Sequence, residues 1–425
     1  MKPITKQTVK PALKFVTVGL LIGLLIGAFI AYGQSPDSTF TISSGVYPGA
    51  PSYTVWREGS EFFAKDANGL LAYSGTDASA VIQAAINAVP GGRIFLTKSM
   101  GRTTLHTGLV SALTGNLNIE GESTWATWES WLLFDGPGAC FSLSAVGYSI
   151  NLKHIGVEPL ATGLCAIDLA GASNSRIEDV LIVGDPINWA VAVYMSGATR
   201  FNGSAFVSAS HMNHLINVVC SATLAETSLP IIALKMDGGV LCNNKFDHCW
   251  FGGGTNNTGK GVYMIGGQVA LNTFTACTIW SAGISLHIVD SGQNNFFGCD
   301  IEAVVTGKTV QIDYGSLNLF IGGCLTGSAN ITFGAGIWNK IFGAFMGPND
   351  AWGLSENSVS ATNATATTFV FNHSLVSTAT NVQCSFNFTG WTSWTWTSTT
   401  TQVTVTITGA LPAAMTCYAK VEYAP

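Results

Sequence analysis

The chain has 425 residues, of which 47% are hydrophobic and only 10% are charged, and its formal net charge is −6. This charge argues against a nucleic-acid-binding protein, because such proteins present to the phosphate backbone a basic stripe that this sequence lacks. The mean hydropathy of +0.35 is typical of buried parallel strands, whose sequences are apolar runs, and so does not require a polytopic membrane protein.

The N-terminal 33 residues have the pattern of a secretion or anchoring segment. Four lysines lie within residues 1–14, and an uncharged apolar run follows at Phe15–Tyr32. The run fits either a signal peptide, cut beside Ala31 and Gly33, or a single membrane anchor, and the lysines place the N-terminus inside in both cases. The rest of the chain is therefore expected outside the cell, either secreted or anchored at its surface. Residues 34–62 follow as a linker and lead-in.

Several features of composition agree with an extracellular location. Lysine is scarce, Ser, Thr, Asn and Gly are abundant, and the chain contains Asn-x-Ser/Thr sequons at which a host that glycosylates proteins can attach glycans. The sequons begin at Asn202, Asn256, Asn330, Asn363, Asn372 and Asn387.

Residues 77–88 predict an amphipathic helix. The apolar side chains recur at the spacing of one helix face, Thr76 or Asp77 can cap the N-terminus, and Pro90 with the two following glycines ends the helix before the strand 93–96. Such a helix would cover the first rung of a coil of parallel strands, whose open edge would otherwise pair with another chain. The apolar face consists of Ala78, Val81, Ile82, Ala85 and Ile86.

The order of motifs in residues 63–123 resembles the N-terminus of the pectate-lyase superfamily of right-handed parallel β-helix proteins, which includes polysaccharide-active enzymes and viral tailspikes. The motifs are Lys65–Gly69, Thr76–Ala88, Gly91–Leu96 and Leu117–Gly121. The Gly-x-Tyr that usually follows the first strand is replaced by Met100–Arg102. The resemblance implies the fold, a polysaccharide or surface glycan as partner, and a homotrimer as one expected assembly. It transfers no catalytic residue, because the family places its active sites in different rungs.

A repeated phrase supports a coil over residues 63–350. An Asn, a Phe and a Cys recur together, and the cysteines are 28, 22 and 25 residues apart. A period in the twenties indicates stacked repeats, and short strand-like runs punctuated by Gly, Asn or Ser precede it from residue 131 onward. We expect a looped-out insertion only at His211–Leu229. The phrases begin at Asn244, Asn272, Asn294 and Asn318, and their cysteines are Cys249, Cys277, Cys299 and Cys324.

The repeated residues are interpreted as structural. We expect the asparagine amides to stack and hydrogen-bond from rung to rung, and the four cysteines to face inward as small stacking residues. A metal site is disfavoured because no paired Cys-x-x-Cys spacing occurs, and nothing in the sequence calls for a cofactor. Cys384 and Cys417, near the C-terminus, are disulfide candidates if the compartment is oxidising.

Residues 355–425 change in composition and lose the period. Apolar residues alternate with polar ones, for example at Val403, Val405 and Ile407, which predicts a small antiparallel β-sandwich. Its simplest role is to cover the last rung. Trp391, Trp394 and Trp396 are either core residues of this module or sugar-binding residues, and alternation on strands favours the core.

The outward side chains of the repeat are the candidate site. If each Cys and the residue two positions after it point inward, then Trp250, Thr278, Trp280, Asp300 and Glu302 point outward. Asp300 and Glu302 would lie about 7 Å apart along one strand, with Trp280 one rung from Glu302. Two carboxylates beside an aromatic platform match the needs of glycoside hydrolysis, and repulsion between them would raise the pKa of one.

Asp247 and His248, at the bend two rungs earlier, could contribute substrate contacts together with Trp250 and Trp280. Elimination by a lyase is the weaker alternative, because no arginine lies on these rungs to neutralise a uronate. An earlier site around Glu178, Asp179 and Arg200 is a further alternative.

Two functions remain open from the sequence. The first is an extracellular carbohydrate-binding coil, with or without cleavage of polysaccharide by Asp300 and Glu302, and the cluster of Trp, Asp and Glu side chains favours it. The second is a non-catalytic surface or virion protein, such as an adhesin, that uses the coil as a rigid scaffold; the scarcity of ionisable residues favours this one.

Overall fold

The computed structural model describes residues 51–422 outside a set of short gaps. The predicted signal peptide or anchor, and most of the predicted linker, lie outside the described residues. Within the described part of the chain, no helix is long and apolar enough to cross a membrane. The gaps fall at 90, 113–115, 123–129, 145–148, 185–188, 204–208, 223–230, 255–257, 304–306, 327–330, 334–338, 343, 347–350, 354–355, 364–367, 373–380, 387–390, 400–401 and 410–414.

The described chain begins with an antiparallel ribbon. Strand β1 (Tyr53–Glu58) pairs with β2 (Glu61–Asp66), which pairs with β3 (Leu71–Gly75). On its other edge β1 runs parallel to β4 (Arg93–Leu96), so the ribbon continues directly into the parallel strands that follow.

Helix α2 (Ala78–Ala88) confirms the predicted helix and its apolar face. Asp77 is the cap, since its carboxylate accepts a hydrogen bond of 2.9 Å from the backbone N of Ser79. The five predicted apolar residues are buried, and the helix contacts β2, β3, β5 and β6. A short 3-10 turn, η1 (Lys98–Met100), follows β4.

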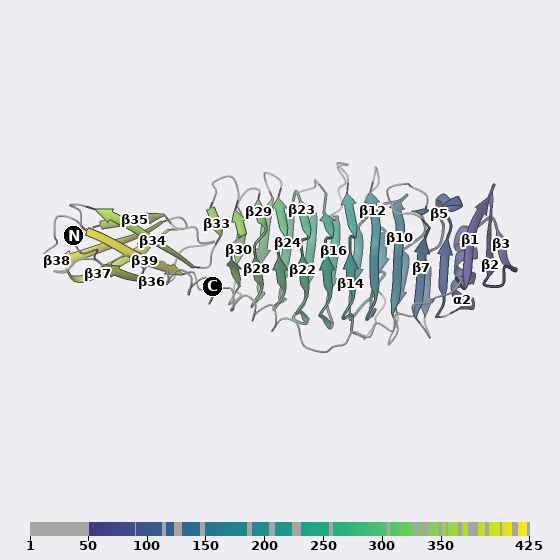
Figure 1. Cartoon of the computed structure of the whole chain (residues 1–425), viewed down its shortest axis with the longest axis horizontal. Coiled ribbons are helices and arrows are strands. Elements are labelled where there is room, and N and C mark those ends of the chain that lie inside the picture. Colours follow the sequence, from purple (N-terminus) through teal and green to yellow (C-terminus); the bar gives the residue numbers. More distant parts are fainter. Residues whose placement is uncertain are drawn as a thin grey trace, which may run out of the picture. The chain divides into compact units, whose positions relative to one another are not determined.

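The central part of the chain is a long parallel sheet made of two stacks, with one strand of each stack in most rungs (Figure 1). Strands β10 and β12 are long enough to belong to both stacks. The first stack is β4, β7 (Leu117–Gly121), β10 (Ile150–Pro159), β12 (Arg176–Gly184), β14 (His214–Ile216), β18 (Lys245–Asp247), β22 (Thr273–Thr275), β25 (Asn295–Phe297), β28 (Leu319–Ile321) and β31 (Lys340–Phe342).

The second stack continues each rung after a bend. Its last strand, β32, pairs antiparallel with β33. The stack is β5 (Gly101–Leu105), β8 (Ser130–Phe134), the ends of β10 and β12, β15 (Val219–Ala222), β19 (Trp250–Gly252), β23 (Thr278–Ser281), β26 (Asp300–Ala303), β29 (Cys324–Thr326), β32 (Ala344–Met346) and β33 (Ala351–Gly353).

A separate nine-stranded parallel sheet supplies the third strand of the rungs. The repeated return of the chain to the same three positions makes the fold a parallel β-solenoid, which confirms the predicted all-β architecture with long parallel sheets. This sheet is β6 (Leu109–Ala112), β9 (Ala139–Ser144), β11 (Cys165–Asp168), β13 (Val191–Met195), β16 (Ile232–Asp237), β20 (Lys260–Ile265), β24 (Ile284–Val289), β27 (Lys308–Ile312) and β30 (Ile331–Phe333), and a short separate pair is β17 (Leu241–Cys242) with β21 (Val269–Ala270).

The bend between the two stacks is built on left-handed residues. One residue per rung has a positive φ, for example 54° at His248 and 49° at Ala276, while the next rungs use Gly298 and Gly322. Glycine carries no steric penalty in this region, and short polar residues carry a small one. The bend turns the second strand of each rung and so sets the direction of its outward side chains.

The predicted asparagine ladder is confirmed and is longer than expected. Each side-chain amide donates to the carboxamide oxygen of the next, over 3.0 Å from Asn213 to Asn244 and 2.9 Å from Asn244 to Asn272. The series continues through Asn294 and Asn318 to Asn339 at 3.0 to 3.1 Å. All six side chains are buried, so the ladder satisfies polar groups that water cannot reach.

The phenylalanines form a second ladder beside it. The ring centroids of Phe246 and Phe274 are 4.3 Å apart, and those of Phe296 and Phe320 are 4.7 Å apart, with nearly parallel planes. These distances are close to the rung spacing of about 4.8 Å. In-register stacking therefore aligns the rings.

The cysteine prediction is correct for three residues and wrong for the fourth. Cys249, Cys277 and Cys299 are buried, but Cys324 is paired in register with the outward Asp300 and is only half-buried. The last phrase contains one extra glycine, and Gly323 lies against the backbone of Cys299. A shift of one residue on a strand reverses which face a side chain occupies.

The predicted insertion at 211–229 is wrong for its described part. Residues 214–216 and 219–222 form β14 and β15, which hydrogen-bond in register to the strands of both neighbouring rungs. In this rung Asn213 and Leu215 occupy the positions of the repeated Asn and Phe, but Val218 stands where the next rungs have Cys. The repeat could therefore not be recognised here from the sequence. The following residues, 223–230, are not described.

The C-terminal segment contains two three-stranded antiparallel sheets. Val403, Val405 and Ile407 are buried, as their alternation predicts. Trp394 and Trp396 pair with Ile407 and Val405 and so share their face, as core residues would. The sheets are β34 (Glu356–Asn363), β39 (Met415–Glu422) and β36 (Asn381–Phe386), and β35 (Thr368–Asn372), β38 (Gln402–Gly409) and β37 (Trp391–Ser398).

The predicted disulfide stays a prediction. The register places Cys417 opposite Phe386 and Cys384 opposite Ala419, so the two cysteines are diagonal neighbours on adjacent strands. The side chain of Cys417 lies outside those described.

Candidate functional site

Two outward rows of side chains run along the second stack. Trp250, Thr278, Asp300 and Cys324 are paired in register in one row, and Gly252, Trp280, Glu302 and Thr326 are paired in the other. The residues between the rows, at Phe251, Ile279, Ile301 and Leu325, are buried. The predicted alternation of faces is thus confirmed.

The two tryptophans come closer together than their positions in the two rows suggest. Trp250 is 50% exposed, and a Cβ placed on Gly252 would lie 3.3 Å from its indole nitrogen. The Trp250 ring therefore leans into the space that Gly252 leaves empty, one rung from half-buried Trp280. The Trp250 indole, the Trp280 indole and the Glu302 carboxylate therefore follow one another along the coil on three consecutive rungs. Neighbouring rungs are about 4.8 Å apart.

Asp300 and Glu302 are both exposed and lie on β26. Side chains two positions apart on a strand are about 7 Å apart and lie on the same face, so both carboxylates point to solvent on the outward face of β26. Although part of the side chain is exposed, neighbouring protein atoms partly desolvate the Asp300 carboxyl and so raise its pKa. The cause is loss of water around the carboxyl, whereas the sequence suggested repulsion between the two acids.

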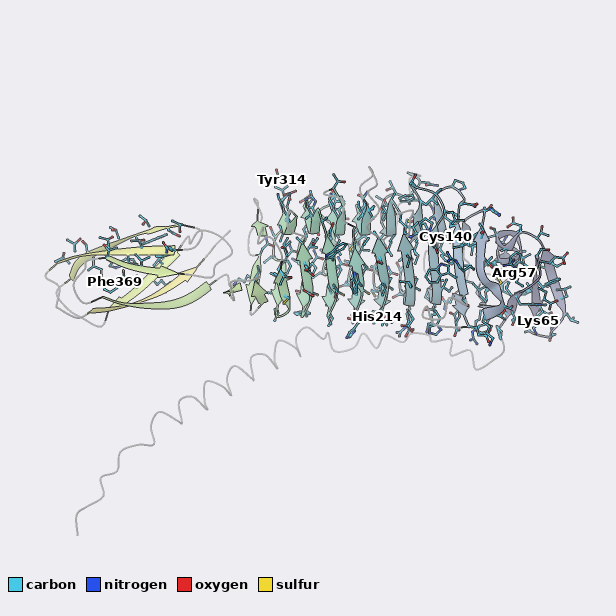
Figure 2. All side chains as sticks on the ribbon, turned by 90° about the horizontal axis from the view of Figure 1, so that it is seen from above. Arg57, Lys65, Cys140, His214, Tyr314 and Phe369 are labelled. Carbon is cyan, nitrogen blue, oxygen red and sulfur yellow. The ribbon has the colours of Figure 1, made fainter. Side chains whose placement is uncertain are left out.

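Asp247 and His248 lie at the bend two rungs before Asp300, as predicted. Asp247 accepts a hydrogen bond of 2.5 Å from Nε2 of His214, the residue labelled on the lower edge of the coil in Figure 2. His248 is exposed, and its backbone N donates to the carbonyl of Thr275. Asp247 is therefore held by a partner, while the His248 imidazole faces solvent.

An apolar rim flanks the acidic strand on the other side of the bend. Phe297 is 36% exposed and Ile321 is 40% exposed, and the two are paired in register on β25 and β28. They precede Asp300 and Cys324 on the same rungs. The sequence did not reveal these two residues, because the direction of their side chains depends on where the bend falls in each rung.

A polar network occupies the upstream rungs of the first stack. Glu178 accepts two hydrogen bonds from Arg176, at 2.8 and 3.0 Å, and lies 3.0 Å from Nζ of Lys153. The hydrogen bonds from Arg176 lower the pKa of Glu178 to about 2. Beside it, at the bend, Asp179 accepts from Asn217 over 2.6 Å and lies 3.4 Å from His154. These groups satisfy one another.

The alternative site that combined Glu178, Asp179 and Arg200 is wrong. Arg200 donates a hydrogen bond of 2.9 Å to Ser142 on β9 of the nine-stranded sheet, whereas Glu178 and Asp179 lie on β12 of the long sheet. Arg176 takes the place that Arg200 was expected to fill. Among the described residues, no group of three or more His, Cys, Asp or Glu side chains is placed to hold a metal ion.

Comparison with known proteins gives structural likeness only. No family model and no curated sequence matches the chain. A tailspike protein of Acinetobacter phage vB_ApiP_P1 is similar over 83% of this chain and 86% of its own, with 10% identity and a TM-score of 0.36. The tailspike protein of Acinetobacter baumannii phage AM24 covers 82% of this chain and 80% of its own, with 12% identity and a TM-score of 0.33.

A third similar structure is tailspike gp49 of Acinetobacter baumannii bacteriophage Fri1, described as a capsular polysaccharide depolymerase. It covers 82% of this chain and 83% of its own, with 9% identity and a TM-score of 0.24.

Proposed function

We propose that this protein binds an extracellular polysaccharide along the outward face of β19, β23 and β26 and cleaves it by hydrolysis. The observation that carries the proposal is the register that sets Trp250, Trp280, Asp300 and Glu302 on one solvent-facing strip. Sugar rings stack on indole faces, and a cut of the glycosidic bond requires two carboxyl groups beside it.

The roles of the two acids follow from their surroundings. Asp300, whose pKa is raised by partial desolvation, is the general acid that protonates the leaving oxygen, because a raised pKa keeps the proton available nearer neutral pH. Glu302 is the base that activates water. The backbone positions of Asp300 and Glu302 lie about 7 Å apart along the strand. Side chains that leave the strand in parallel keep their carboxyl groups at a similar distance, within the range of about 6.5 to 9.5 Å for inverting glycosidases. The reaction is therefore expected to invert the anomeric centre.

The remaining parts of the molecule fit this role. Helix α2 acts as the cap of the first rung, and the two C-terminal sheets pack as a sandwich module. The N-terminal segment directs the chain outside the cell, and it is either cleaved or kept as an anchor. A homotrimer is the assembly to test first, by light scattering of the purified ectodomain.

The test of catalysis uses Asp300→Asn and Glu302→Gln, with Glu61→Gln as the control. Glu61 is exposed on β2, in the N-terminal ribbon. Purified ectodomains are incubated with acidic and neutral polysaccharides, and reducing ends, unsaturated ends and the anomer of the product are measured. We expect wild type and Glu61→Gln to produce reducing ends, and each site variant to lose at least about a hundredfold in rate.

The results separate the possible functions. Unsaturated ends among the products would show that the protein cleaves by elimination and not by hydrolysis. Undiminished rates in both site variants would refute the roles of Asp300 and Glu302.

The test of binding uses Trp280→Ala, with Trp56→Ala in the N-terminal ribbon as the matched control. Loss of one stacking platform is expected to weaken binding about fivefold or more, while the control binds as wild type. No retention of any polysaccharide, together with no cleavage, would leave the coil as a structural scaffold or adhesin.

A further inference from the structure

The nine-stranded sheet carries a second cluster of chemistry-bearing side chains, on a different sheet from the strip on β19, β23 and β26. One outward row places Lys235, Tyr263, His287 and Gln311 in register on consecutive rungs. A neighbouring row contains Lys260, Ile284 and Lys308 in the same register. Sequence analysis missed these residues because they share no motif and lie up to 76 positions apart along the chain.

Ring contacts and hydrogen bonds connect the side chains of these two rows. Nζ of Lys260 lies 3.5 Å from the centroid of the Tyr263 ring, and the opposite neighbour of that ring is His287, stacked with centroids 5.0 Å apart. Nε2 of His287 lies 2.9 Å from the Asp313 carboxylate. Gln311 donates to the other oxygen of Asp313 over 2.7 Å and accepts from Nζ of Lys308 over 2.8 Å.

The positive charge of this cluster is not balanced within it. Lys235 is paired with Asp237 at 2.5 Å, and Asp313 is engaged by His287 and Gln311. Among the described residues, neither Lys260 nor Lys308 forms an ion pair. The three lysines and two aspartates leave one positive charge on a chain whose net charge is −6.

Two pKa directions follow from this arrangement. Burial, with a smaller contribution from Lys235, lowers the pKa of Lys260. Burial also lowers the pKa of His287, whose Nδ1 is buried without a hydrogen-bond partner among the described residues. His287 is therefore neutral at pH 7, and the unbalanced charge sits on the lysines.

We propose that the face of β20, β24 and β27 is a second saccharide-binding site, which receives an anionic substituent of a glycan between Lys260 and Lys308. The two lysines stand on either side of Ile284, two rungs or about 10 Å apart at the backbone. Their flexible stems can converge on one anion above Ile284, which leaves an apolar floor for the sugar ring. The Tyr263, His287 and Asp313 stack holds Lys260 in place, and Gln311 holds Lys308.

A partly desolvated pair of lysines, Lys260 and Lys308, that shares the single nearby carboxylate of Asp313 carries a free-energy cost. The face of Tyr263 offsets part of it, and a bound anion would offset the rest. The proposal does not depend on cleavage at Asp300 and Glu302, which lie on the other sheet.

The test measures binding of defined oligosaccharides to the ectodomain by calorimetry at low ionic strength. The probes are tetragalacturonate, its fully methyl-esterified form and a sulfated galactan tetrasaccharide. The variants are Lys260→Gln and Lys308→Gln, and Lys65→Gln is the control. Lys65 is a suitable match because it also rests on an aromatic ring, with Nζ 5.6 Å from the Trp56 centroid, and it lies at the N-terminal end of the coil (Figure 2).

We expect wild type and Lys65→Gln to bind at least one acidic probe, with an affinity that falls as salt rises. Lys260→Gln and Lys308→Gln should each weaken that binding about tenfold or more. The methyl-esterified probe should bind at least about tenfold more weakly than the free acid. Tighter binding of the sulfated probe would identify sulfate as the preferred anion. Tighter binding of the uronate would identify carboxylate.

Three results would overturn the proposal. They are equal affinity of both site variants and wild type, equal binding of the esterified probe, and no binding of either acidic probe. Failure of this site is separable from failure of the first one, because Asp300→Asn should retain the anion binding and Lys260→Gln should retain the cleavage rate. The circular dichroism of each variant confirms its fold, and the salt dependence of the wild type tests the site without any substitution.

Discussion

Replacement of Asn294 by alanine tests whether the asparagine ladder stabilises the coil. The buried Asn294 side chain accepts hydrogen bonds from both the backbone N and Nδ2 of Asn272, at 3.1 and 3.0 Å. Its own Nδ2 donates to Asn318, Val269 and Ser291 at 3.1 to 3.3 Å. Replacement by alanine removes all of these side-chain hydrogen bonds at once.

The expected magnitude comes from the groups that lose their only acceptor. The backbone N–H of Asn272, and one of its two amide hydrogens, would be left unpaired in a region that water does not reach. The other amide hydrogen keeps its bond of 3.1 Å to Leu241. Each unpaired buried donor costs about 1 to 3 kcal/mol, so the free energy of unfolding should fall by about 2 to 6 kcal/mol.

The assay is urea unfolding followed by tryptophan fluorescence, combined with amide hydrogen exchange. The control is Asn295→Ala, the same substitution at the next residue, whose side chain is half-buried on the outward face and whose loss should cost less than about 0.5 kcal/mol. The amide of Asn272 should exchange faster in Asn294→Ala alone, because only that variant removes its acceptor. Equal stability of the two variants, with no change in this exchange, would refute the reasoning.

Two further predictions concern the upstream rungs. Because the folded pKa of Glu178 lies at about 2, below its ordinary value of 4.5, the stability that it contributes is present above pH 4.5 and is lost as pH falls toward 2; Glu178→Gln should flatten acid unfolding over this range, and an unchanged curve would contradict the pairing with Arg176. Gly156→Ala should destabilise by more than about 2 kcal/mol in thermal unfolding, since its Cβ would lie 1.9 Å from the Trp131 ring. Gly75→Ala, whose Cβ would make an ordinary contact of 3.8 Å, should be close to neutral, and similar losses in both would argue against a clash.

The repeat was the part of the fold that the sequence could predict. Asn272, Phe274 and Cys277 each stack on an identical residue in the next rung, so the constraint repeats and becomes visible as a period. Where the identity changes, the prediction failed. The rung at 213–222 keeps the geometry with Asn213 and Leu215 but has no cysteine at Val218, and the extra glycine before Cys324 turned that side chain outward.

The candidate strip was predicted in part for the same reason. Alternation on β23 and β26 follows from backbone geometry once the inward residues are known, so the faces of Trp280 and Glu302 could be inferred. The approach of Trp250 toward Gly252 could not, because it depends on a side-chain rotamer that the neighbouring space permits. The cause of the raised pKa of Asp300 is also a property of its surroundings in three dimensions.

The sequence by itself determined the class of fold, helix α2 with its apolar face, the ladders and the outward set from Trp250 to Glu302. Each of these rests on local spacing or on a period that the chain repeats. The tertiary structure alone decided which distant residues share a face, such as Lys260 with Tyr263, His287 and Asp313, and which partner holds Asp247. Each strand of a solenoid meets the strands one rung away, which lie twenty or more residues off in the sequence, so contacts between unlike side chains leave no pattern that a single sequence can reveal.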